Sequence, residues 1–200
     1  MKRRLLSLLF TWLLITSAAF AQEYRQLTNL PSVYVNTYSG AGITSKENYI
    51  YARLVWVDEK GTAVYDSIQI RGRGNSTWGM AKKPYRIKLQ KKKRLLGSDH
   101  AKARSWTLLA NCADKAMIRN ALASEVGAFL GLKFNPAAEF VDFYLNNKYK
   151  GTYQVSDQID IRPQRVDIYE QVYQVTDNTT DVSGGYLLEA TGNYDSSDPY

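Results

Sequence analysis

The sequence predicts an α+β fold in which an antiparallel sheet carries one long packed helix. Two pairs of strand-like segments support the sheet: residues 51–57 and 64–71 around a turn, and residues 140–145 and 149–155 around two asparagines. One amphipathic segment, residues 113–130, lies between the two pairs and predicts the helix. Strands, then one helix, then further strands are typical of the α+β class.

The first half of the chain is expected to supply strands and one loop. A strand at residues 33–36 precedes the first hairpin, and a loop with three glycines follows it at residues 72–79. In the next strand, residues 84–89, apolar side chains alternate with Arg86 and Lys88. This alternation predicts one apolar face and one face that is either solvated or functional.

The predicted helix carries an acidic side chain in an unusual place. Asp114 favours a helix start and Gly131 a helix stop. At 100° per residue, Glu125 falls in the middle of the apolar face. A carboxylate directed at a core is costly unless a cation meets it. Either Glu125 pairs with a lysine of the adjacent sheet, or it reaches solvent near the helix edge.

The remaining elements are short. Residues 106–110 predict a buried strand before the helix. Residues 174–183 are polar and predict a loop, and residues 185–189 predict a short last strand.

The first segment has the pattern of a secretory signal peptide. Residues 2–4 are basic, residues 5–15 are mostly apolar, and Ala19 and Ala21 form a small-x-small cleavage site. The apolar run is shorter than the roughly 18 residues that span a bilayer. We therefore expect residues 1–21 to be removed after Ala21, and residues 22–200 to be a secreted, periplasmic or cell-surface domain that is not held in the membrane.

The basic charge of the chain is local. The 200 residues carry 26 Lys and Arg against 19 Asp and Glu, a formal charge of +7. Ten of the basic residues lie between positions 67 and 98, where no acidic residue occurs. Without this segment and the three basic residues of the leader, 13 basic residues would face 19 acidic ones. A single anionic ligand fits this pattern better than a nucleic acid does.

Several chemistries are disfavoured by composition. The chain has one cysteine, Cys112, and one histidine, His100. A zinc site of cysteines and histidines, a histidine-based triad and an intramolecular disulfide are therefore not expected. Cys112 is expected to be a small buried residue.

The glycine loop, the basic strand and the helix glutamate together have the layout of a phosphate-handling lobe. Glycines let backbone N–H groups approach phosphate oxygens, a lysine neutralises the phosphates, and a glutamate holds the lysine. The loop alone is also compatible with an ordinary tight hairpin turn.

Five runs of sequence in register resemble the CotH (spore coat protein H) kinase-like family. They are residues 73–78 (RGNSTW), 82–89 (KKPYRIKL), 106–111 (WTLLAN), 144–147 (YLNN) and 184–189 (GGYLLE). The resemblance implies the N-lobe of an atypical protein-kinase-like fold. It also implies ATP-dependent phosphorylation, with Mg²⁺, of secreted or surface acceptor proteins.

The resemblance also implies roles for particular residues. Lys83 is the first choice for the phosphate-contacting lysine, because it has the same parity as the apolar residues of its strand, and Glu125 is its expected partner. Lys82 and Lys88 are the rival lysines. The further nucleotide-binding residues are expected to be Arg73, Gly74, Asn75 and Tyr186, the last of these in the segment that leads to a second lobe.

Two departures from the family pattern affect these expectations. Asp157 stands where the family usually has a glutamate, which keeps the charge and changes the reach. The family's metal-binding aspartates lie in a second lobe, and Asp195 and Asp198, in a polar tail, are not expected to replace them. We therefore expect this chain to be an N-terminal portion that is inactive alone. The alternative function is a non-catalytic surface module, structural or carbohydrate-binding, suggested by 15 tyrosines and four tryptophans.

Overall fold

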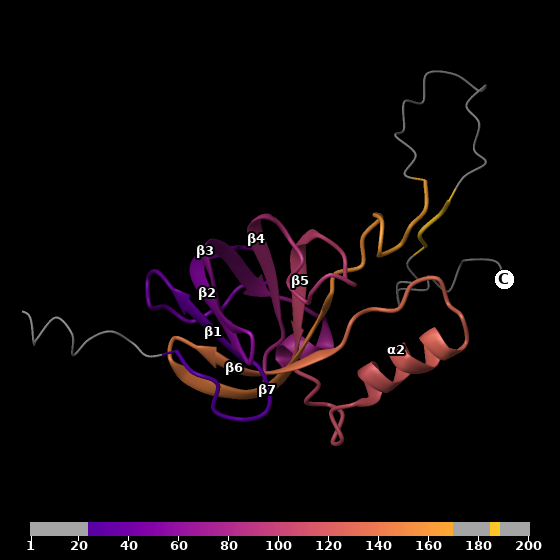
Figure 1. Cartoon of the computed structure of the whole chain (residues 1–200). Helices are drawn as coiled ribbons and strands as arrows, with labels where there is room; N and C mark the ends of the chain where they lie inside the picture. Colours follow the sequence, from indigo (N-terminus) through magenta and orange to yellow (C-terminus); the bar gives the residue numbers. More distant parts are fainter. Residues whose placement is uncertain (1–23, 170–184, 189–200) are drawn as a thin grey trace, which may run out of the picture.

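The computed structural model describes residues 24–169 and 185–188 (Figure 1). Seven strands form a closed barrel in the order β1-β2-β3-β4-β5-β7-β6. Neighbouring strands are antiparallel, except that β6 runs parallel to β1 where the barrel closes. The strands are β1 (Ser32–Thr37), β2 (Ile50–Asp58), β3 (Gly61–Gly72), β4 (Tyr85–Lys93), β5 (Ala103–Leu109), β6 (Glu139–Leu145) and β7 (Lys148–Asp157).

The predicted α+β class is wrong, because the described chain is a β-barrel with little helix. It contains a short 3₁₀ turn, η1 (Ser76–Gly79), and one α-helix, α2 (Arg119–Phe129). Figure 1 shows α2 beside the barrel and not across a face of an open sheet. The apolar faces of the seven strands pack against one another inside the barrel, so no helix is needed to cover them.

The barrel interior is the hydrophobic core. Residues on the inward side of every strand belong to one buried cluster, whose larger members include Leu54, Ile87, Trp106, Phe143 and Tyr153. Each of these side chains is at most 2% exposed. Burying a side chain of this size stabilises a fold by ~1.5–3 kcal/mol before entropy is subtracted.

Most strand predictions are confirmed, and the second hairpin also closes the barrel. Asn146 and Asn147 have φ values of 49° and 63°, the left-handed pair that a tight hairpin turn requires. The Asn146 Oδ1 atom accepts the backbone N–H of Thr37 at 2.8 Å. The asparagine turn between β6 and β7 therefore also holds the end of β1.

The helix is shorter than predicted. Residues 111–118 form turns, and α2 begins at Arg119. Asp114 still prepares the helix start, because its Oδ2 atom accepts the Arg119 N–H at 2.8 Å. This and the other backbone hydrogen bonds to the carboxylate lower the pKa of Asp114.

Some predicted elements lie outside the described residues. These are the leader at 1–21, the loop at 174–183, and Glu189, Asp195 and Asp198. Residues 185–188 are described and are not a strand, so the last strand is wrong over that range. No described helix is both long and apolar enough to cross a bilayer.

Candidate functional site

Three arginines converge where β3 ends and β4 begins, and we call them the arginine cluster. Arg71 is paired directly with Arg86 across the two strands. Arg73 follows β3, and its backbone N–H donates to the carbonyl of Pro84 just before β4, at 3.2 Å. All three line a cavity of about 250 Å³, here called the arginine cavity, together with Gly74 and Asn75 of the glycine loop.

The arginine cluster has buried donors without acceptors. The Nε atoms of Arg71 and Arg86 are buried and have no hydrogen-bond partner among the described residues. Arg71 reaches one carboxylate, that of Glu47 at 4.0 Å, whereas no described carboxylate forms an ion pair with Arg73 or Arg86.

The electrostatics of the cluster favour an anion. Burial lowers the pKa of Arg73, and the neighbouring guanidinium of Arg86 lowers it further. Arginine nonetheless keeps its proton in proteins, so the two like charges are held together at a cost. An anion that accepted the free N–H groups would remove both the repulsion and the unpaired donors.

A larger cavity of about 770 Å³ adjoins the arginine cavity, and Arg73 and Gln158 line both. We call it the helix cavity, because it lies between the outer face of β5 and β7 and the helix α2. Its polar lining residues include Thr107, Ser156 and Asn120, and its apolar ones include Leu109 and Phe134. Its volume is within the range of small-molecule sites, roughly 300–1,000 Å³.

The helix α2 presents its small residues to this cavity and its large apolar residues to solvent. Asn120, Ala123 and Ser124 line the helix cavity. The opposite stripe is exposed by 52%, 57%, 47% and 90% at Ile118, Leu122, Val126 and Phe129. The apolar stripe that predicted a packed helix therefore has no cover from the described residues.

The predicted pair of Lys83 and Glu125 is not brought together. Glu125 is exposed on the outward stripe of α2, and no described residue forms an ion pair with it. The Lys83 ammonium instead donates to the carbonyl of Trp78 at 2.6 Å and lies 5.3 Å from that ring.

The two rival lysines also have other partners. The Lys82 ammonium donates to the carbonyl of Thr152 and lies 4.5 Å from the centroid of the Tyr153 ring. Burial lowers the pKa of Lys82. Lys88 lies 5.8 Å from the ring of Tyr49. In the described residues, none of the three lysines lines the arginine cavity or the helix cavity.

Closure of the barrel explains why Lys83 lies at neither the arginine cavity nor the helix cavity. The parity that Lys83 shares with Tyr85, Ile87 and Leu89 points into the closed core, where no charged ligand can enter. The opposite parity carries Arg86, next to the cavities. The alternation of apolar and basic residues in β4 predicts that the face carrying Arg86 is solvated or functional. This alternation is therefore the sequence signal that could have identified Arg86.

The glycine loop is shaped by a tryptophan. A Cβ atom on Gly72 would lie 2.4 Å from the Trp78 ring, and one on Gly74 would lie 2.2 Å from the Thr77 hydroxyl. Gly74 also has a φ of +88°, which favours glycine. The loop therefore folds tightly over Trp78, and this fold places Arg73, Gly74 and Asn75 at the arginine cavity.

Asp157, which stands where the resemblance implies a glutamate, forms a buried ion pair with Arg165. Asp157 Oδ1 accepts Arg165 Nε at 2.8 Å, and its Oδ2 accepts the Ala137 N–H at 3.0 Å. Arg165, which sequence reasoning missed, also lies 4.9 Å from the ring of Trp106. Asp157 lines the helix cavity as well. The pair fixes the chain after β7 against the barrel beside that cavity.

Two further predicted residues, Tyr186 and Cys112, are placed as follows. Tyr186 is 59% exposed, while the neighbouring Leu187 and Leu188 line the helix cavity. Cys112 is exposed, so its predicted burial is wrong. Within the described ranges, no group of three or more His, Cys, Asp or Glu residues is placed to hold a metal ion.

A model of the CotH kinase protein family matches residues 70–196. The chain belongs to the CotH kinase family. The match starts near the end of β3, so the part shared with the CotH family contains the arginine cluster, the glycine loop, α2 and the second hairpin. The strands β1 and β2 precede it. A search of curated proteins finds no match.

Proposed function

We propose that this CotH-family chain binds ATP at the arginine cluster and takes part in ATP-dependent phosphorylation of secreted or surface proteins. Membership of the CotH kinase family supports a kinase-related function in general. The observation that carries the proposal is the pair of buried Nε donors on Arg71 and Arg86, which have no described acceptor. Both residues line a cavity together with Arg73.

In this proposal the three arginines hold the phosphates. Planar guanidinium groups match phosphate oxygens with paired hydrogen bonds, and such charge-assisted bonds are stronger than neutral ones. Gly74 and Asn75 lie on the rim of the same cavity, where the loop backbone can approach a phosphate. We place Arg86, and not Lys83, in the role of the main phosphate-binding side chain.

The helix cavity would hold the nucleoside. Thr107, Ser156 and Asn120 offer hydroxyl and amide groups for a ribose or a base edge, and Leu109 and Phe134 offer apolar surface for the base. Leu187 and Leu188, the neighbours of Tyr186, line this cavity. We therefore propose that Tyr186 contacts the nucleotide at the edge of the helix cavity.

ATP would supply the transferred phosphoryl group, and Mg²⁺ would neutralise charge on it. The described carboxylates do not fit a metal site: Asp157 is already bound to Arg165, and no group of three or more described His, Cys, Asp or Glu residues is placed to hold a metal ion. We therefore assign the described residues to binding and orienting the phosphates, with no metal ligand among them.

Export remains part of the proposal and rests on the leader pattern alone. Expression of the full chain with its leader, followed by N-terminal sequencing of the exported product, tests it. We expect a new terminus at Gln22; retention of the intact leader in the cell would contradict the expectation.

The test of nucleotide binding is isothermal titration of the chain with a series of ligands: ATP, AMP, adenosine and inorganic triphosphate. We expect ATP and triphosphate to bind at least tenfold more tightly than adenosine, and the affinity to fall as salt is raised. Equal binding of ATP and adenosine would contradict a phosphate site, and so would no binding of either.

A further inference from the structure

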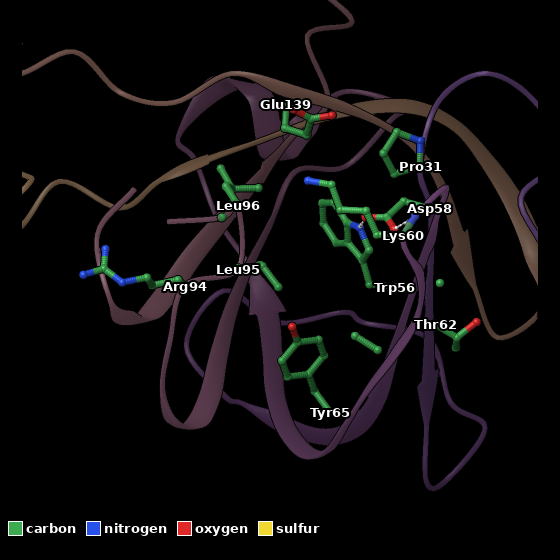
Figure 2. A pocket seen from close by; sticks show the side chains of 13 residues that line it. Pro31, Trp56, Asp58, Lys60, Thr62, Tyr65, Arg94, Leu95, Leu96 and Glu139 are labelled. Atoms are coloured by element: carbon green, nitrogen blue, oxygen red, sulfur yellow. Dashed lines mark hydrogen bonds between the residues drawn. The ribbon is translucent and has the colours of Figure 1, made fainter. Parts of the chain in front are cut away.

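A separate cavity lies at the other end of the barrel (Figure 2). This barrel-end cavity has a volume of about 360 Å³ and is lined by the turn between β2 and β3, the start of β6 and the chain after β4. It shares no lining residue with the arginine cavity or the helix cavity. The stretch of β3 from residue 63 to residue 72 separates the sites by about 30 Å at the usual rise of a strand.

Two cations, Lys60 and Arg94, and two carboxylates, Asp58 and Glu139, line this cavity, and no ion pair joins any of them. The Arg94 guanidinium donates instead to the carbonyl of Ser98 and to Gln164 Oε1. Lys60 comes from the β2–β3 turn and Glu139 from the first position of β6. No ion pair joins their side chains, and neither has a hydrogen bond to another described side chain. Burial raises the pKa of Glu139, while His100 and Lys60 act to lower it and Asp58 to raise it.

The second carboxylate of the cavity, that of Asp58, is held firmly in place. The Trp56 indole N–H donates to Asp58 Oδ2 at 3.0 Å, and the Lys60 backbone N–H donates to Asp58 Oδ1 at 2.8 Å. These hydrogen bonds fix Asp58 at the β2–β3 turn, and its negative charge acts to raise the pKa of Glu139. The Tyr65 hydroxyl, directed toward the cavity in Figure 2, has no hydrogen-bond partner in the described chain.

Apolar side chains form another part of the lining, beside Thr62 and Arg94. Trp56, Leu95 and Leu96 form much of the wall between the charged groups, with Pro31 at the edge. Trp56 and Leu95 are each 8% exposed, so they present surface to the cavity while their bulk remains in the core. Small-molecule sites combine apolar surface with placed polar groups, and this cavity has both.

We propose that the barrel-end cavity binds a small zwitterion, an α-amino acid with an apolar side chain. Its ammonium group would lie at Glu139, its carboxylate at Lys60, and its side chain against Trp56 and Leu95. A ligand that carries both charges satisfies both side chains at once, whereas a phosphate would meet the carboxylates of Glu139 and Asp58. This site is independent of the proposed ATP site.

The test uses fluorescence of the tryptophans and isothermal titration with L-leucine and three relatives that each lack one feature. N-acetyl-L-leucine lacks the positive charge, L-leucinamide lacks the negative charge, and glycine lacks the side chain. We expect L-leucine to bind at least tenfold more tightly than each relative, since losing one charge-assisted contact costs about one factor of ten or more.

Variants assign each charge to its side chain. Lys60→Met should abolish the preference for L-leucine over L-leucinamide, and Glu139→Gln should abolish the preference over N-acetyl-L-leucine. Lys91→Met serves as the matched control, because Lys91 is an exposed residue of β4 that does not line the cavity. This variant should bind L-leucine like the wild type. All three are surface positions, and unchanged melting temperatures would show that each variant is folded.

Several results would overturn the proposal. Equal binding of the neutral derivatives would show that the charges do not select the ligand. Binding of glucose without binding of L-leucine would assign the cavity to sugars. No heat and no fluorescence change at about 10 mM L-leucine, well above a millimolar dissociation constant, would show that no amino acid binds.

Discussion

Replacing the buried Arg165 by methionine is expected to destabilise the barrel strongly. The Arg165 side chain is 0% exposed and Asp157 is 3% exposed. The guanidinium donates to Asp157 at 2.8 Å, to Asp160 at 3.3 Å and to the Ser105 carbonyl at 2.9 Å. Methionine fills a similar volume but leaves the Asp157 carboxylate buried without its cation.

The size of the effect follows from the burial. Removing one partner of a buried ion pair costs about 3–5 kcal/mol, most of it from the charge that is left behind. For a domain of this size, each kcal/mol lowers the melting temperature by roughly 2–4 °C, so a decrease of roughly 6–20 °C is expected. Removing both charges in Arg165→Met/Asp157→Asn should recover a large part of this loss.

Urea unfolding followed by circular dichroism measures the free energy of unfolding of each variant. Arg162→Met is the matched control, because Arg162 pairs with Asp160 but is 26% exposed, and its loss should cost less than about 1 kcal/mol. If Arg165→Met cost no more than this control, or if the double variant were no more stable than Arg165→Met, the buried pair would not anchor the chain after β7.

Three further predictions concern packing, backbone and pH. Phe129→Ser should change the free energy of unfolding by less than about 0.5 kcal/mol, because Phe129 is 90% exposed. The buried Phe143 is the comparison, and Phe143→Ala should cost about 3–5 kcal/mol. A large loss of stability on Phe129→Ser in urea unfolding would show that the apolar stripe of α2 is covered. Gly74→Ala should lower the free energy of unfolding by at least ~1 kcal/mol, and the melting temperature with it, because Gly74 has a positive φ and a Cβ atom there would lie 2.2 Å from the Thr77 hydroxyl. Gly79→Ala should have no such effect, because a Cβ atom at Gly79 would meet open space. Equal effects of the two changes would refute the loop geometry. Burial raises the pKa of Tyr153, so the tyrosine hydroxyl loses its proton at a lower pH in the unfolded chain than in the folded one. The free energy of unfolding should therefore fall as the pH rises above about 10, and Tyr153→Phe should lessen that fall. An unchanged pH profile of unfolding in Tyr153→Phe would contradict the raised pKa.

The strands could be predicted because their information is local. Alternation of side chains and the two asparagines gave both hairpins, and the asparagine turn adopts the conformation that its residues favour. Closure of the barrel could not be predicted this way. It depends on the parallel pairing of β1 with β6, which joins residues more than 100 positions apart through a register that no local pattern specifies.

Local patterns placed some of the predicted residues at a cavity and did not place others there, and their role in binding a ligand stays a prediction. Arg73, Gly74 and Asn75 lie at the arginine cavity, as a glycine loop after a strand suggested. The expected pair of Lys83 and Glu125 required an open sheet with a helix packed on the Lys83 side. Because the sheet closes, that side is the core, and the side that borders the arginine cavity carries Arg86. Arg165 was missed because a basic residue in a polar segment gives no local indication of burial.

The affinity of ATP for two matched variants, Arg86→Met and Lys83→Met, tests the proposed site most directly. Each change removes one positive charge from the same short basic segment, so the loss of overall charge is equal. With both variants folded, isothermal titration should show ATP binding weakened at least tenfold by Arg86→Met and less than twofold by Lys83→Met. Weakening by Lys83→Met with unchanged binding to Arg86→Met would contradict the arginine site and restore the lysine as the phosphate-binding residue.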